Sequence, residues 1–157
     1  MGVRVQVEPF VLADELKGFG VGSGVGAQVT FTGIVRDDGG LVRMEIEHYP
    51  AMTERAIAAM VGTATERWAL ADCHVVHRFG KLKPGEQIMM VATAAAHRAA
   101  AFEAAEFLMD YLKSRAPFWK KEVTSSGAAW VRSKDEDEEA LGRWRPDRPV
   151  KGSAGSA

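Results

Sequence analysis

The chain has 157 residues, and 20 basic against 21 acidic side chains give it a formal net charge of −1. This balance argues against a general nucleic-acid binder and against a protein that anionic membranes attract by charge. The length predicts one domain with its own core, and a single cysteine, Cys73, excludes an internal disulfide framework. No apolar run reaches the roughly 18 residues of a membrane span, and residues 1–11 lack the apolar segment of a signal peptide. We therefore expect a soluble, cytoplasmic protein.

The N-terminal part combines a short strand with a glycine-rich segment. Apolar and polar residues alternate over 3–7, which predicts a strand. Five glycines follow within 18–26, but they fit neither the G-x-G-x-x-G spacing nor a G-x-x-x-x-G followed by Lys-Ser/Thr. We expect a flexible loop or turn there rather than a nucleotide-binding loop.

A hairpin is predicted next. Residues 28–36 alternate as a strand, with Gly33 typical of a bulge or a close backbone approach. Asp37 to Gly40 offers a tight connection to a further alternating stretch over 42–49. The two stretches are therefore expected to pair with each other.

Two amphipathic helices enclose another pair of strands. Pro50 opens the first helix, in which apolar residues recur at helical spacing from Met52 to Trp68. Strands over 73–79 and 87–95 follow, and Pro84-Gly85 between them occupies type II turn positions, so a second hairpin is expected.

The second helix is predicted from His97 to Ser114, with Phe102 among its inward-facing residues, and Pro117 prevents its continuation. Beyond it we expect a last strand over 122–132, with a turn at 125–127. The class is therefore α+β.

The C-terminal region is predicted to be a short helix followed by a tail. Residues 135–144 combine an acidic start with a basic end, which suits the helix dipole. Residues 145–157, rich in Pro, Gly and Ser, predict a disordered tail, so that the domain covers 1–144.

Metal binding is not expected. Cys73 and His77 face one side of their strand and His74 the other, so the three cannot converge on zinc. His48, at an alternating strand position, is interpreted as structural too. The acidic run over 135–139 has none of the glycine spacing of a calcium loop and is interpreted as a solvated helix start.

The basic groups around Pro117 are more informative. Lys113 and Lys120 flank this break, and Arg115 and Lys121 adjoin them. Each could be a surface residue, because a lysine near a helix end gains from the dipole alone. Lysine also binds phosphate as a point charge, and desolvated beside other cations it becomes a nucleophile. From spacing alone, we predict an anion-binding site on a cytoplasmic α+β domain.

Five blocks of the sequence occur in the order FTGIVR, EHYPAMTE, HRFGKLKPGE, AHRAAAFEAAEFLMDYLKSRAPFWKKE and GAAWV. In this order they closely resemble the large, catalytic subunit of molybdopterin synthase. The resemblance is collinear from about Gln28 to Trp144, with the first 27 residues and the tail after Trp144 outside it.

The resemblance implies a sulfurtransferase of molybdenum cofactor biosynthesis, with an α/β hammerhead fold. Its sulfur comes from a small ubiquitin-like partner whose C-terminal Gly-Gly tail ends in a thiocarboxylate. Two sulfur atoms enter cyclic pyranopterin monophosphate and form the dithiolene of molybdopterin. The large subunits form a central homodimer within a heterotetramer, and neither a metal nor a separate cofactor is implied.

Residue by residue, the resemblance marks Lys113 and Lys120 as the two catalytic lysines. We expect Lys113 nearest the reacting carbon and Lys120 at the partner's terminal carboxyl group, while nucleophile, acid/base and clamp all stay open as roles. The further matched positions are substrate-binding groups, namely Arg36, His97, Arg98, Lys121 and Glu122.

Helix geometry divides these groups. Arg98 and Lys113 are 15 positions apart on one predicted helix, which places them about 22 Å apart along its axis. No pterin monophosphate spans that distance, so His97 and Arg98 are expected to serve the site of the neighbouring subunit. The alternative is that the helix breaks near Ala101, or that His97 and Arg98 only cap it.

Two features depart from the family pattern. Ile34 stands where a lysine is common, and the turn over 37–41 is short. Two other functions stay open as alternatives. One is a non-catalytic module that docks a ubiquitin-like protein through the same basic patch, and the other is a phosphate-binding protein of unrelated role.

Overall fold

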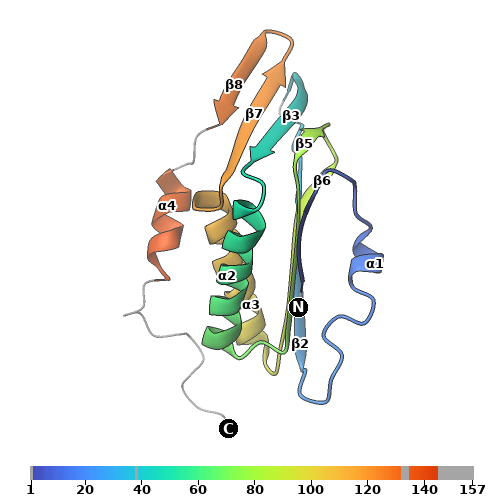
Figure 1. The fold of residues 1–157 in the computed structure, drawn as a ribbon, viewed down its shortest axis with the longest axis vertical. Helices are drawn as coiled ribbons and strands as arrows, with labels where there is room; N and C mark the ends of the chain where they lie inside the picture. The colour runs from blue at the N-terminus through green and yellow to red at the C-terminus, as the bar shows by residue number, and fades with distance from the viewer. Residues whose placement is uncertain (1, 38, 132–134, 145–157) are drawn as a thin grey trace.

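The computed structural model describes residues 2–37, 39–131 and 135–144. Two four-stranded sheets and a layer of helices make up this part, which confirms the predicted α+β class (Figure 1). The predicted disordered tail lies outside the described residues, and the boundary of the domain at residue 144 stays a prediction. None of the described helices is both long enough and apolar enough to cross a membrane.

The first sheet, sheet A, carries the main core. Its strands lie in the order β1 (Gly2–Gln6), β4 (Asp72–Arg78), β6 (Gln87–Ala95) and β2 (Ala27–Ile34). Only the β1–β4 pair is parallel. From Ile88 to Ala95, β6 is buried, as expected for an almost wholly apolar strand that is covered on both faces.

The second sheet, sheet B, projects beyond sheet A at one end of the molecule (Figure 1). It is antiparallel, in the order β5 (Gly80–Leu82), β3 (Leu41–His48), β7 (Phe118–Thr124) and β8 (Gly127–Val131). The predicted last strand is thus the hairpin β7–β8, and its first strand begins before residue 122.

The predicted hairpin between residues 28–36 and 42–49 is wrong. β2 pairs with β6 in sheet A, whereas β3 pairs with β5 and β7 in sheet B. The predicted irregularity at Gly33 is confirmed by a register shift between Gly33 and Ile34. Gly39 and Gly40 both have positive φ, at 55° and 94°. Because β2 and β3 belong to different sheets, these glycines lie in a connection between the sheets rather than in a hairpin turn.

The second predicted pair of strands, β4 and β6, is confirmed, and the connection between them contains a further short strand, β5. β4 and β6 pair antiparallel, and the turn forms through the Glu86 N–H, which donates to the Lys83 carbonyl at 3.1 Å. Gly85 has φ 88°, as a type II turn requires. Between β4 and this turn, however, β5 crosses to sheet B.

Two long helices cover one face of sheet A (Figure 1). They are α2 (Met52–Trp68) and α3 (Arg98–Ser114), and their buried residues form the main core with β4 and β6. Phe102, predicted to face inward, is 61% exposed. Ala101, Ala104 and Leu108 face the core instead, and the next position along a helix points about 100° away. Met52, at the start of the α2 stripe, is also exposed.

The opposite face of sheet A is covered by the segment that contains α1 (Leu12–Glu15) (Figure 1). Phe10 and Phe19 of this segment pack on Val76 and Met90 in a second, smaller core. The predicted loop or turn over 18–26 is confirmed, and Phe19 and Val25 within it pack against the sheet.

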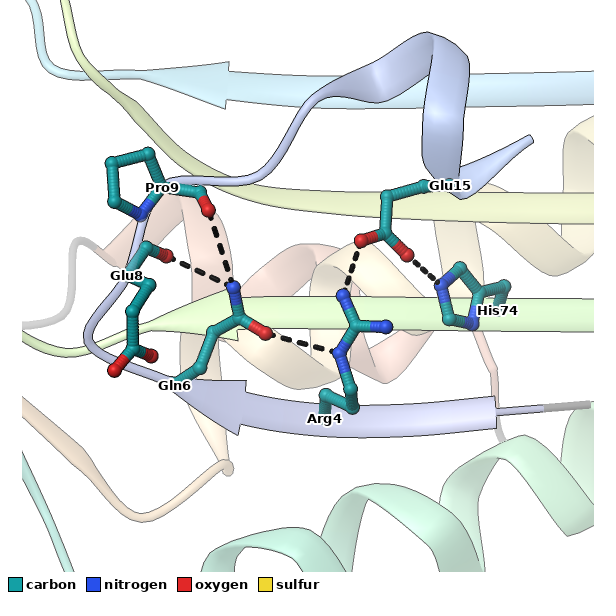
Figure 2. A network of polar contacts seen from close by, with 6 residues as sticks. All are labelled: Arg4, Gln6, Glu8, Pro9, Glu15 and His74. Carbon is teal, nitrogen blue, oxygen red and sulfur yellow. Dashed lines mark hydrogen bonds and ion pairs between the residues drawn. The ribbon is translucent and has the colours of Figure 1, made fainter. Parts of the chain in front are cut away.

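A polar network fastens this segment to the sheet (Figure 2). Glu15 accepts hydrogen bonds from Arg4 of β1 and from His74 of β4, the latter at 2.7 Å. Burial raises the pKa of Glu15, but these two donors outweigh it and leave the pKa below the usual range. His74 thus lies on the face opposite to the buried Cys73 and His77, as the strand alternation predicts.

The short helix α4 (Asp135–Gly142) confirms the predicted element over 135–144. It packs on the end of α3, where the Ser114 hydroxyl donates to the Asp137 carbonyl at 2.9 Å. Beyond α4, the Trp144 indole N–H donates to Asp110 at 2.6 Å. These contacts hold α4 beside the C-terminal end of α3.

Candidate functional site

A cavity of about 450 Å³ lies where the end of α3 meets both sheets. Its wall contains both predicted catalytic lysines together with apolar side chains from β2, β6 and α3. The charged residues that line it are Arg36, Lys113, Lys120, Glu122 and Asp137. The lysines predicted from the sequence therefore meet in one concave site.

The chain reversal at Pro117 brings the two lysines together. Lys113 lies in the last turn of α3, and the backbone N–H groups of Arg115 and Ala116 both donate to the Tyr111 carbonyl, at 2.8 and 3.1 Å. The chain then enters β7, where Lys120 points toward the cavity. Helix end, turn and strand thus place one lysine on each side of the break.

The surroundings of Lys120 perturb its amine. Burial and, next, the positive charge of Lys113 together lower its pKa to about 8, against the opposite effect of the Asp137 carboxylate. A pKa near 8 leaves roughly one amine in ten unprotonated at pH 7. Such an amine can transfer a proton or act as a nucleophile near neutral pH.

Arg36 and Glu122 also line the cavity, as expected for substrate-binding groups. Lys121, although it adjoins both Lys120 and Glu122, does not. Its ammonium lies 3.9 Å from a Glu45 oxygen and 5.2 Å from the ring centroid of Trp130. Successive residues of a strand point to opposite faces, so Lys121 lies on the far face of sheet B.

His97 and Arg98 are not brought to this cavity. Both are exposed at the start of α3, and the helix runs unbroken from Arg98 to Ser114. This confirms the predicted unbroken helix, and the alternative of a break near Ala101 is excluded. Within one chain, these two residues and Lys113 lie at opposite ends of the helix, about 22 Å apart along its axis.

Two residues of the cavity wall, His77 and Asp137, were not predicted from the sequence as site residues. His77 was interpreted as structural, but it lies in the wall beside Lys113 and Lys120. Asp137 was included in a solvated acidic run, yet it borders the cavity from α4. The alternation along β4 could have predicted that the His77 side chain faces inward. Nothing in the sequence indicated that α4 packs beside the cavity and brings Asp137 to it.

His48, at the end of β3 in sheet B, packs against neighbouring side chains rather than lining the cavity. His48 Nδ1 lies 3.1 Å from the Thr53 hydroxyl, and its ring packs against Phe79 at a centroid distance of 4.2 Å. Among the described residues, no cluster of three His, Cys, Asp or Glu side chains could hold a metal ion.

The sequence and the fold are both similar to those of known proteins. The model of the MoaE protein family matches residues 5–115. The likeness therefore starts well before Gln28, where the sequence blocks placed it, and the expectation that the first 27 residues lie outside it is wrong. The molybdopterin synthase catalytic subunit of Cereibacter sphaeroides is 66% identical over 146 residues, covering 92% of this chain and all of that relative.

Solved structures agree. A molybdopterin biosynthesis MoaE protein from Burkholderia ambifaria is 46% identical with a TM-score of 0.77, over 92% of this chain and 98% of that one. Molybdopterin synthase from Staphylococcus aureus is 29% identical with a TM-score of 0.75, over 82% of this chain and 95% of that one. By family model, by close relatives and by fold, this chain belongs to the MoaE family.

Proposed function

We propose that this chain is the catalytic subunit of a molybdopterin synthase. It transfers sulfur from the C-terminal thiocarboxylate of a small ubiquitin-like partner to cyclic pyranopterin monophosphate. The observation that carries the proposal is the meeting of Lys113, Lys120 and Arg36 in one cavity of about 450 Å³. Membership of a family whose relatives bear the name molybdopterin synthase catalytic subunit supports it.

The charges in the cavity suit these reactants. Arg36 and the two lysines are donors without acceptor atoms, which fits a substrate phosphate and the terminal thiocarboxylate of the partner. Each transfer joins the thiocarboxylate sulfur to a substrate carbon, where a carbon–oxygen bond breaks and the departing oxygen takes up a proton. Water then cleaves the acyl–sulfur bond, leaving a carboxylate on the partner and the sulfur on the substrate.

We assign different positions to the two lysines. Lys113, exposed at the end of α3, lies nearest the reacting carbon, and Lys120, half-buried in β7, meets the partner's terminal carboxyl group. The pKa of Lys120 near 8 suits the proton transfers that accompany formation and cleavage of the acyl–sulfur bond.

His97 and Arg98 complete the proposal through a dimer. Since both lie at the far end of α3, they are expected to serve the cavity of a second copy of the chain. Each of the two sites in a homodimer would then contain residues of both subunits. One small subunit at each end makes the whole assembly a heterotetramer, and the cytoplasm, where thiols stay reduced, is the compartment we propose.

Replacement of Lys113 by alanine tests the function. Partner binding, measured by calorimetry, should survive in Lys113→Ala, whereas molybdopterin formation from thiocarboxylated partner should fall by orders of magnitude. Lys121→Ala is the matched control, because the Lys121 side chain lies on the face of sheet B that points away from the cavity. Wild-type turnover by Lys113→Ala would instead favour a non-catalytic docking module.

A further inference from the structure

His77 is a core residue that nevertheless borders the cavity. It lies near the end of β4, opposite Met89 of β6 and Val5 of β1. Its side chain is 2% exposed, and its ring stacks on Phe118 of sheet B at a centroid distance of 3.8 Å and an angle of 17°. The ring is therefore held between the two sheets with little freedom to turn.

The hydrogen bond of His77 fixes its tautomer. Nδ1 lies 2.7 Å from the carbonyl oxygen of Arg78. A carbonyl oxygen only accepts, so Nδ1 carries the hydrogen, and in the neutral ring Nε2 carries the lone pair. Burial and, next, the charge of Lys120 lower the pKa of His77 to about 3, although the hydrogen bond to Arg78 acts in the opposite direction. The ring is thus neutral near pH 7.

Nε2 opens toward the cavity. Among the described residues, the His77 side chain makes its hydrogen bond through Nδ1, and Nε2 makes none. No fully buried side-chain nitrogen or oxygen of these residues lacks a partner, so Nε2 must reach accessible space. The space that His77 borders is the lysine cavity.

An uncharged acceptor complements the other groups of the cavity. Arg36, Lys113 and Lys120 offer donors, which suit anionic groups and leave ring N–H donors of a pterin unmatched. Glu122 and Asp137 can accept as well, but they are carboxylates, which attract the cationic groups of the cavity, as Asp137 does Lys120. A buried lone pair repels a phosphate oxygen and attracts an N–H group.

We propose that His77 is a substrate-binding residue, whose Nε2 accepts a hydrogen bond from an N–H group of the pterin ring system. The inference rests on the proposed function. It adds an orientation for the substrate: the ring lies against His77, and the phosphate points toward the cationic groups. His77 then distinguishes the pterin from other phosphate-bearing compounds.

Two substitutions separate this contact from packing. His77→Asn keeps an amide N–H near Nδ1 for the Arg78 carbonyl but has no acceptor at the Nε2 position, whereas His77→Gln extends an amide oxygen toward it. Loss of one neutral hydrogen bond should raise KM for the pterin about tenfold in His77→Asn and only about twofold in His77→Gln. Inhibition by inorganic phosphate should stay unchanged in both. Equal KM values for wild type and His77→Asn, or an equal rise in both variants, would overturn the proposal.

A measurement on the wild-type protein avoids any folding defect. In protein labelled with ¹⁵N-histidine, saturating pterin monophosphate should move the Nε2 resonance of His77, and inorganic phosphate should not. An unmoved resonance in protein that binds and converts the pterin would refute the role of His77 alone. Protein that neither binds nor converts the pterin would refute the proposed function as well.

Discussion

Lys120 should cost the protein stability. Burial and the neighbouring Lys113 depress its pKa from the usual 10.5 to about 8, which corresponds to about 3 kcal/mol against the charged form. The side chain is only half-buried, so screening by water reduces the expected cost to about 2 kcal/mol. Lys120→Met replaces the amine with an unbranched apolar side chain of similar length. We expect it to be about 2 kcal/mol more stable than wild type at pH 7, and inactive.

The dependence on pH identifies the cause. Below pH 8 the amine is protonated in both the folded and the unfolded chain, so the full cost is present. Between about 8 and 10.5 the folded protein releases this proton first, so wild-type stability rises toward that of Lys120→Met. Urea unfolding of both proteins from pH 7 to pH 10 measures this difference.

Lys121→Met is the matched control on the same strand. It removes a contact with Glu45 and a position over the Trp130 ring, so it should be no more stable than wild type. If Lys120→Met gained nothing over wild type at pH 7, or if its advantage stayed constant up to pH 10, the buried-amine explanation would be refuted.

Three further predictions concern other parts of the molecule. Cys73→Ser should retain turnover in the sulfur-transfer assay, since burial raises the pKa of this thiol to about 12 and leaves it protonated; loss of transfer in a folded variant would point to sulfur carried on this chain. Mixed dimers of inactive Arg98→Ala and inactive Lys113→Ala should regain activity, because one of their two sites is then wild type at both positions; demonstrated subunit exchange without activity would exclude shared sites. Glu15→Gln, which weakens the network in Figure 2, should lower the free energy of unfolding by about 1–2 kcal/mol at pH 7. Because the pKa of Glu15 is lowered, this loss should shrink as the pH falls below 4.5, and a loss that stays constant would exclude an ionic origin.

Local patterns predicted the elements well and their partners less well. The strand alternation, the helix spacing and the turn at Pro84-Gly85 depend on neighbouring residues, and the structure has all three. The pairing of β2 with β6, by contrast, joins strands that are far apart in the sequence, so it depends on tertiary packing. A short glycine-containing connection favours a hairpin in isolation, and tertiary packing overrode that preference.

The site residues also fall into two groups, those that local sequence predicted and those that it did not. Lys113 and Lys120 flank one chain break, so local geometry was enough to bring them together. His77 comes from sheet A, and Asp137 from helix α4, which packs on the end of α3. Their places in the cavity wall follow from tertiary contacts, which the spacing of residues in the sequence does not contain.

The strand pairing also has a kinetic consequence. Val3 pairs with Val75, Thr30 with Ala92, and Glu45 with both Lys81 and Lys121, so none of the three early strands has its partners nearby in the sequence. Closing such long loops costs entropy before packing compensates it, which places refolding in the range of about milliseconds to seconds. On the ribosome, β1, β2 and β3 emerge as unpaired edges. Sheet A closes once β6 has left the exit tunnel, and β7 then brings Lys120 to Lys113 as one of the last steps of maturation.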